Sequence, residues 1–117
     1  MEARMKLGMD SEGLVAREMT RRGYDIVHRN YRTRYGELDI VARRGSEMVV
    51  VEVRSRNNDL GYEALESVQH GKREKVRRTT EIYLSYRPID YDEVRFFVAT
   101  VNWVDGSPSI AIIEDAF

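Results

Sequence analysis

The chain has 117 residues, of which 42% are hydrophobic and 33% are charged, with a net charge of −1. This is the composition of a globular protein with one hydrophobic core, so we expect a single domain over residues 1–117 and exclude general disorder. The absence of cysteine excludes disulfides, thiol catalysis and Cys-ligated metals, and the lack of a long apolar run or a signal-peptide core predicts a cytoplasmic protein without a membrane partner.

The first predicted element is a helix over residues 3–22, ended by Gly23, a residue type that commonly ends helices in the left-handed conformation. At 100° per residue, the helix has an apolar face made of Val15, Ala16 and Met19. Glu12 lies in the middle of that face. It is either a functional acid directed at the core or a capping glutamate near the start of the helix, and the residues alone leave both interpretations open.

A strand over residues 24–30 and a hairpin come next, and short links predict an antiparallel meander. The hairpin joins residues 35–42 to residues 48–54 through a turn at Gly45 and Ser46, the form that takes glycine first. This turn sets the register of the two strands. It pairs Asp39 with Glu52, Ile40 with Val51 and Glu37 with Arg54.

The register separates an apolar face from a charged face. The apolar face is expected to contain Leu38, Ile40, Ala42, Val49, Val51 and Val53. Asp39 and Glu52 then meet on the other face, where two like charges repel unless a partner compensates them. A divalent cation is the simplest partner, and oxygen-only ligands suit Mg²⁺ or Mn²⁺ rather than zinc. The alternative is an ordinary charged surface exposed to solvent.

Basic residues concentrate around this hairpin. Seven Lys and Arg outnumber four Asp and Glu between residues 29 and 56, whereas two face seven after residue 78. Such an excess is what a phosphate backbone requires. The candidate nucleic-acid-binding residues here are Arg29, Arg32, Arg34 and Arg56, the last at the start of a loop-like segment over 56–62. The alternative interpretation of Arg29, Arg32 and Arg34 is that they are ordinary solvated charges at a sheet edge, where they prevent aggregation.

A second helix is predicted over residues 68–86, with its core-facing stripe made of Val76, Thr80, Tyr83 and Leu84. Most of the cations near its start are expected to form a solvated helix face. Gln69 and Lys72 fall nearest the end of the hairpin and are therefore added to the nucleic-acid-binding candidates.

Two strands complete the chain, over residues 94–101 and 109–113, with a hairpin signal around Asp105 and Gly106 between them. The order α-β-β-β-α-β-β predicts an α/β fold, with a mixed central sheet flanked by helices.

Several motifs resemble one family. They are Ser11-Glu12-Gly13, Gly36-Glu37-Leu38-Asp39, Val51-Glu52-Val53-Arg54 and the terminal Ala116-Phe117. Over nearly the whole chain they are similar to the YraN-like family of small bacterial proteins. That family resembles a branch of the PD-(D/E)xK, or restriction-endonuclease-like, nuclease superfamily, akin to the archaeal Holliday junction resolvases. The resemblance implies an αβββαβ core around a Mg²⁺-dependent phosphodiesterase site.

The resemblance also implies roles for individual residues. The metal ligands would be Asp39, Glu52, the backbone carbonyl of Val53, and Glu12 from the first helix. The lysine of the superfamily motif falls on Arg54, which keeps the positive charge but cannot act as a base. Phe97 stands where an acid is expected in a later strand, so any auxiliary role of that acid is absent from this chain.

We therefore expect a metal-dependent endonuclease for branched or structured nucleic acid, with DNA as the expected substrate and Mg²⁺ or Mn²⁺ as the cofactor. Its catalytic residues would be Glu12, Asp39, Glu52 and Arg54. Two alternatives stay open: a module of the same fold that binds nucleic acid or protein without cleaving it, and a cation site that only stabilises the fold. A homodimer is the expectation by analogy with the resolvases.

Overall fold

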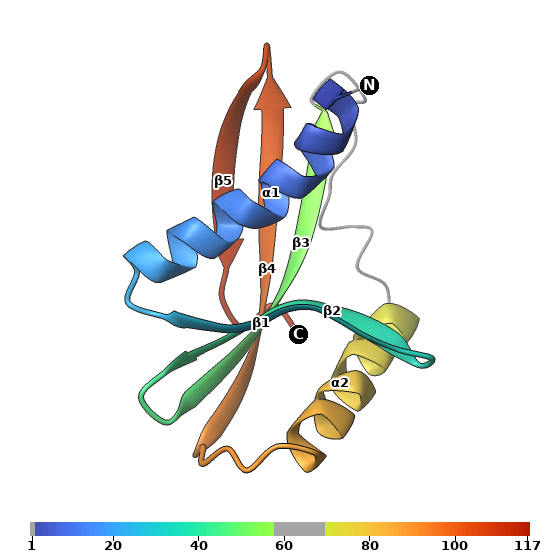
Figure 1. Ribbon diagram of the computed structural model, residues 1–117, viewed down its shortest axis with the longest axis vertical. Helices are drawn as coiled ribbons and strands as arrows, with labels where there is room; N and C mark the ends of the chain where they lie inside the picture. The colour runs from blue at the N-terminus through green and yellow to red at the C-terminus, as the bar shows by residue number, and fades with distance from the viewer. Residues whose placement is uncertain (1, 58–69) are drawn as a thin grey trace.

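The computed structural model describes residues 2–57 and 70–117. The elements in this part of the chain are α1 (Glu2–Arg21), β1 (Asp25–Thr33), β2 (Gly36–Arg44), β3 (Glu47–Asn57), α2 (His70–Ser85), β4 (Glu93–Val104) and β5 (Ser107–Ile113). Their order follows the prediction (Figure 1). The fold is α/β and is compatible with the expected αβββαβ core, to which β5 adds one further strand.

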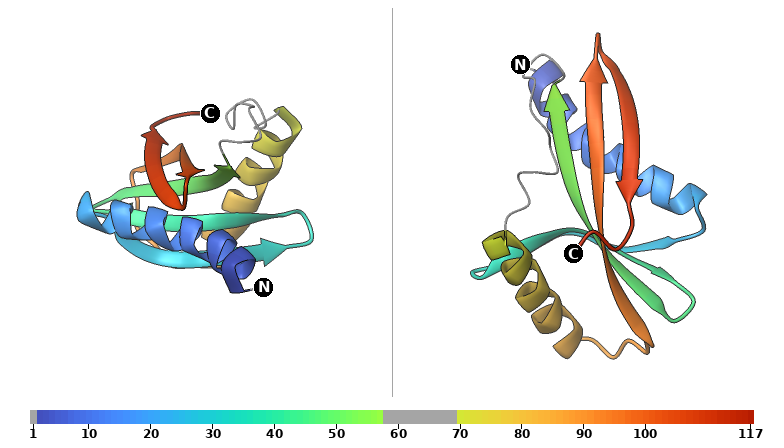
Figure 2. Two further views of the ribbon diagram at one scale, coloured as in Figure 1. Left: turned by 90° about the horizontal axis from the view of Figure 1, so that it is seen from above. Right: turned by 180° about the vertical axis from the view of Figure 1, so that it is seen from behind.

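The five strands form one sheet in the order β1-β2-β3-β4-β5. Neighbouring strands are antiparallel except β3 and β4, which are parallel. The sheet is therefore mixed, as predicted. Because parallel neighbours need a long crossover connection, α2 lies between β3 and β4 in the chain. Seen from above, α1 and α2 lie on opposite sides of the sheet (Figure 2).

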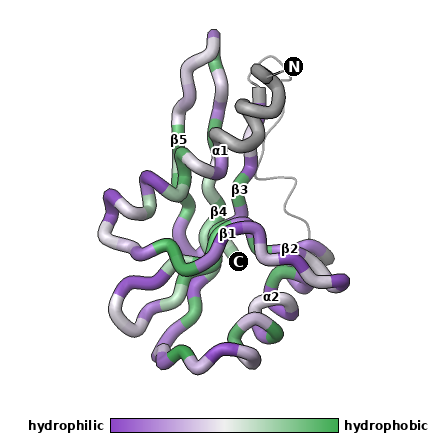
Figure 3. Tube along the Cα trace, in the orientation of Figure 1, coloured by the Kyte–Doolittle hydropathy of each residue, from purple (hydrophilic) through white to green (hydrophobic). Residues whose placement is uncertain are grey.

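Each helix covers its own hydrophobic core. The core under α1 includes Val15, Met19, Ile40, Val49, Val51 and Phe97. The core under α2 includes Leu38, Val41, Met48, Val50, Val76 and Tyr83. Successive residues of β3 thus enter the two cores alternately, which explains why this strand is a continuous apolar run in the sequence. Hydrophobic residues gather along the central strands between the two helices (Figure 3).

The predicted end of the first helix is confirmed. Gly23 has a φ of 99°, a left-handed conformation that glycine adopts without strain. The Gly23 amide donates to the carbonyl of Thr20, and the Tyr24 amide donates to that of Met19, both at 3.0 Å. This pair of hydrogen bonds satisfies carbonyls that the helix end would otherwise leave without a partner.

The hairpin register is confirmed near the turn and ends earlier than predicted. β2 and β3 pair from Arg44 opposite Glu47 to Ile40 opposite Val51, and Gly45 has a φ of 61°. Beyond Ile40 the pairing with β3 stops, while β2 continues against β1 as far as Gly36. The outer end of β2 therefore belongs to a two-stranded arm that approaches α2 (Figure 1).

This departure makes three expectations wrong. Asp39 does not pair with Glu52 in the ladder, because the β2–β3 pairing ends at Ile40 opposite Val51. Glu37 does not face Arg54, because it pairs with Arg32 of β1. Leu38 does not share the face of Ile40, because it packs in the core under α2. Alternation is relative to the local sheet, and two-stranded ribbons twist more strongly than wider sheets. The face of β2 that carries Leu38 therefore turns toward α2 once β2 has left β3.

Two further boundaries concern segments that carry predicted site residues. Arg56 and Asn57 belong to β3 rather than to a loop, and the remainder of the predicted loop lies outside the described residues. The expected helix start at residue 68 also lies outside them, and α2 is described from His70. Its core-facing stripe is confirmed, since Val76, Thr80 and Tyr83 are buried.

The approach of β2 to α2 depends on Gly36. A Cβ added there would lie 2.9 Å from Oγ1 of Thr79, a fully buried residue whose hydroxyl donates to the Lys75 carbonyl at 2.7 Å. Because Thr79 cannot move without losing that bond, we expect Gly36→Ala to destabilise the protein by about 1–3 kcal/mol. Denaturant unfolding measures this change. As a control, Gly13→Ala adds a methyl group to open space on α1 and should be neutral or stabilising.

Candidate metal and phosphate site

The candidate site lies where β2 leaves β3. Just past the last ladder pair, the amide of Val53 donates to Oδ2 of Asp39 at 2.8 Å. A side-chain carboxylate thus replaces the backbone acceptor that a continued ladder would have provided. Within a strand, the N–H and C=O of one residue point to the same side, so the Val53 carbonyl is directed to the side that Asp39 occupies.

Glu52 is the buried acid of the site, with 4% of its surface exposed. Its Oε2 lies 3.1 Å from Nζ of Lys72 on α2 and 3.6 Å from Nη2 of Arg54 on β3. Buried carboxylates are retained when cations neutralise them, and here two cations come from different elements. The carboxylate and the two cations together form a compact charged cluster between β3 and α2.

Asp39 is in the opposite electrostatic situation. Burial is the largest cause and the negative charge of Glu52 the second, and the pKa of Asp39 is raised to about 7. The hydrogen bond from the Val53 amide lowers the pKa in part, whereas Glu12 and Glu37 raise it further. Three carboxylates from three elements therefore repel Asp39. It either holds a proton near neutral pH or requires a cation beside it.

Glu12 approaches this region from α1, where its charge contributes to the raised pKa of Asp39. Its Oε1 accepts hydrogen bonds from Nδ2 of Asn30 at 2.9 Å and from Nε of Arg29 at 3.3 Å. Asn30 has a φ of 57°, a left-handed conformation that asparagine tolerates better than most residues. The sequence analysis did not assign a role to Asn30.

The acids do not form a ready-made metal cage. Among the residues described, no group of three or more His, Cys, Asp or Glu side chains is arranged to hold a metal ion. Asp39 and Glu52 are close enough to influence each other, while Glu12 is engaged by β1. The assignment of Glu12, Asp39, Glu52 and Val53 as metal ligands, and of Arg54 as their catalytic companion, stays a prediction.

The basic candidates occupy different positions. Arg29 contacts Glu12, Arg32 pairs with Glu37 at 3.3 Å, and Arg34 donates to the Tyr35 hydroxyl at 3.4 Å. These three arginines are exposed along β1 and the turn after it. Arg56 is half-buried in β3, with its Nε shielded from solvent. Gln69 lies outside the described residues.

Lys72 was expected near the hairpin as a phosphate-binding residue, and the structure places its ammonium group against Glu52. The proximity could be anticipated from the chain order. The partner could not, because 20 residues separate the two positions and packing sets the rotation of α2 about its axis.

The sequence of the chain is similar to those of known proteins. The family model of the uncharacterised protein family UPF0102 matches residues 11–101. The chain belongs to this family. A UPF0102 protein of Thermodesulfovibrio yellowstonii is 35% identical over 98% of both chains, and one of Rhodococcus opacus is 36% identical over the full length of both. A relative from Moorella thermoacetica is 38% identical over 95% of this chain and 92% of its own.

Membership of UPF0102 confirms the resemblance to the YraN-like family. The names of these UPF0102 relatives state no activity, so the chemistry must be argued from the site. No helix in the described part of the chain is long and apolar enough to cross a lipid bilayer.

The raised pKa of Asp39 predicts a pH-dependent stability. The unfolded carboxyl titrates near 3.8 and the folded one near 7, so the folded state loses stability as the pH rises from about 4 through 7. Asp39→Asn keeps an acceptor for the Val53 amide without the charge. We expect it to raise the melting temperature, by more at pH 8 than at pH 5.

Thermal unfolding at the two pH values measures this difference, and carboxyl NMR reports the pKa directly. The matched control is Glu18→Gln on α1. Hydrogen bonds from Arg21 and Arg22 lower the pKa of Glu18 to about 2, so its removal should destabilise the protein equally at pH 5 and pH 8. An Asp39 pKa below 5 would contradict the electrostatics described for this site.

Proposed function

We propose that this UPF0102 protein is a divalent-metal-dependent nuclease that hydrolyses phosphodiester bonds at the Asp39–Glu52 site. The observation that carries the proposal is the electrostatic state of Asp39. Its carboxylate is repelled by Glu52 and is held by a backbone amide of the neighbouring strand. Such perturbed carboxylates concentrate at catalytic sites, because the same destabilisation is relieved when a cation binds.

The available donors suit Mg²⁺ or Mn²⁺. The carboxylates of Asp39 and Glu52 and the carbonyl of Val53 are all oxygen ligands, which hard divalent cations prefer. Glu12, held by Arg29 and Asn30, is better suited to orient a water molecule than to bind directly. When bound, the cation supplies an activated water and polarises the scissile phosphate.

The cations of the site stabilise the charge that develops on the phosphate. Arg54 cannot accept a proton, so its role is electrostatic. Lys72 approaches the same carboxylate from α2 and brings a second positive charge. We assign these two residues to the neutralisation of the scissile phosphate, and the exposed arginines 29, 32 and 34 to contacts with the nucleic-acid backbone that do not depend on sequence.

The substrate and the assembly follow from the resemblance to the resolvases. We propose branched or structured DNA as the substrate, a homodimer as the active form and the cytoplasm as its location. The substrate, the dimer and the location do not depend on the chemistry of the site, so any of them can be wrong while the nuclease proposal holds.

A second function is favoured by one observation. Glu52 is already neutralised by Lys72 and Arg54, and Glu12 by Arg29, so the protein itself satisfies two of the three acids. A module that binds nucleic acid or protein without cleaving it would need no metal. Cleavage assays separate the two functions.

We expect purified protein with Mg²⁺ or Mn²⁺ to cleave at least one member of a panel of duplex, single-stranded, flap and four-way-junction DNA. Asp39→Asn and Glu52→Gln should lower the rate by about 100-fold or more, because they remove metal-binding oxygens. Binding should persist in both variants. Gel electrophoresis of labelled substrates measures cleavage, and anisotropy measures binding.

The matched control for these variants is Glu93→Gln, an exposed acid at the start of β4, which should cleave at the wild-type rate. If the wild type and the variants all bind the panel and none cleaves it, the nuclease proposal is wrong and the non-cleaving binding module is the function supported.

Metal binding has its own readout. A ligand that binds only the folded state stabilises it by about 2.7 kcal/mol at 100 times its Kd. We therefore expect Mg²⁺ to raise the melting temperature of the wild type, and expect this rise to vanish in Asp39→Asn and Glu52→Gln. Differential scanning fluorimetry with a Mg²⁺ titration measures it, with Glu93→Gln again as the control. An equal rise in all four proteins would place the bound cation elsewhere.

A further inference from the structure

A groove of about 950 Å³ runs along α2 beside the turn that joins β1 to β2. The turn contributes Arg34 and Tyr35, and the helix contributes Lys75, Arg78 and, just past its end, Tyr86. A neighbouring hollow of about 400 Å³ shares Arg34, Tyr35 and Lys75 with the groove and extends to Lys72. The two hollows therefore adjoin each other, and we call them together the α2 groove.

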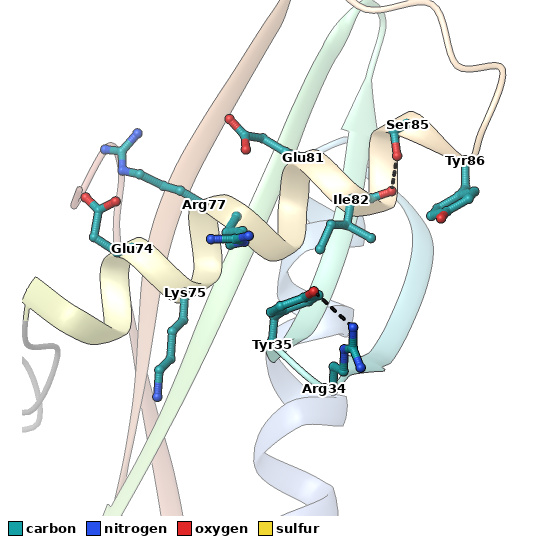
Figure 4. Close-up of a pocket in the computed structure, with 10 residues that line it drawn as sticks. Arg34, Tyr35, Glu74, Lys75, Arg77, Glu81, Ile82, Ser85 and Tyr86 are labelled. Carbon is teal, nitrogen blue, oxygen red and sulfur yellow. Dashed lines mark hydrogen bonds between the residues drawn. The ribbon is translucent and has the colours of Figure 1, made fainter.

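The α2 groove is positively charged although the chain is not. Its cations are Arg32, Arg34, Lys72, Lys75, Arg77 and Arg78, and its acids are Glu37, Glu74 and Glu81. Arg32 already pairs with Glu37. Figure 4 shows Lys75 extending on the same side of α2 as Tyr35, whereas Glu81 extends to the other side. The floor of the groove thus offers cations to a polyanion.

Aromatic rings accompany these cations. Tyr86 is 79% exposed and Tyr35 is 41% exposed, although aromatic residues are usually buried. The guanidinium of Arg78 lies 4.9 Å from the centre of the Tyr35 ring, and that of Arg34 lies 5.3 Å from it. Planar guanidinium and phenol groups are the surfaces on which unpaired bases stack.

The groove leads to the candidate site. Lys72 lines its inner end and lies 3.1 Å from Glu52. From Lys72 to the end of α2 at Ser85, a rise of about 1.5 Å per residue gives a length of about 20 Å. Stacked nucleotides rise about 3.4 Å each along one strand, so the groove matches about six of them.

We propose that the α2 groove binds a single-stranded arm of a nucleic acid, with the phosphates on Lys75 and Arg78 and with bases stacked on Tyr35 and Tyr86. Bases inside a duplex present no free faces to these rings, whereas unpaired bases do. An acidic peptide would satisfy the cations but would leave the exposed tyrosines without a function. The position of the arm relative to a cleaved bond rests on the proposed nuclease function, but the binding itself does not.

The test is a binding experiment in EDTA, so that no cleavage takes place. Fluorescein-labelled duplexes with a single-stranded oligothymidine arm of 0 to 12 nucleotides are titrated by anisotropy at several salt concentrations. We expect the affinity to rise with arm length up to about six nucleotides and then to level off. Tyr86→Ala should weaken binding of the armed duplex by at least about fivefold and leave the blunt duplex unaffected.

Arg78→Gln tests the electrostatic part. We expect the slope of log K against log salt to become shallower by about 0.7, the contribution of one phosphate contact on a single strand. The matched controls are Tyr91→Ala and Arg17→Gln, which change an exposed tyrosine and an exposed arginine outside the groove and should leave affinity and slope unchanged.

Three results would overturn the inference: affinity that does not depend on the arm, controls that weaken binding as much as the groove variants, or displacement of the arm by poly-glutamate at equal charge concentration. The nuclease proposal fails separately. Arm binding without hydrolysis would contradict the nuclease proposal and support the groove. Hydrolysis that persists in Tyr86→Ala and Arg78→Gln, with armed and blunt duplexes bound equally, would support the nuclease and contradict the groove.

Discussion

The candidate site and the groove both depend on the separation of β2 from β3 after the pair Ile40–Val51. A continued ladder would have joined the Val53 amide to a backbone carbonyl of β2. Because β2 turns away, the carboxylate of Asp39 accepts that hydrogen bond and is drawn into a half-buried position near Glu52. The same turn carries the outer end of β2 to α2, where Gly36 allows the close approach. One change in the direction of β2 therefore creates both the perturbed carboxylate of Asp39 and the α2 groove.

The acids near the end of the β2–β3 pairing have different electrostatic surroundings. Glu52 is neutralised by Lys72 and Arg54, and Glu12 is bound by Arg29 and Asn30. Asp39 receives one amide hydrogen bond, while burial, and after it the charges of three carboxylates, raise its pKa to about 7. A protein that needed only stability would place a neutral residue there. The charged form of Asp39 lowers the stability of the fold, and exposed cations lie nearby. A local loss of stability of this kind is typical of functional sites.

Helix α2 connects these features because its sides face different surroundings. Val76 and Tyr83 are buried against the sheet, whereas Lys75 and Arg78 line the groove. Lys72, near the described start of the helix, lines the inner end of the groove and contacts Glu52. A single strand of nucleic acid bound along α2 would consequently approach Glu52 and Asp39 from the side of Lys72. The helix thus joins the proposed chemistry to the proposed recognition of a single-stranded arm.

The sequence by itself determined the local features: the helix end at Gly23, the glycine turn at Gly45, the register next to that turn and the order of the elements. It also indicated the family, because the motifs are contiguous and span the chain. Only the tertiary structure decided that Leu38 enters the core under α2, that Lys72 rather than a neighbouring cation meets Glu52, and that Tyr35 and Tyr86 flank one groove. Periodicity and turn chemistry act over a few residues and can be read from neighbours in the chain. Where a strand leaves its partner, and how a helix is rotated, are set by packing between residues far apart in the sequence.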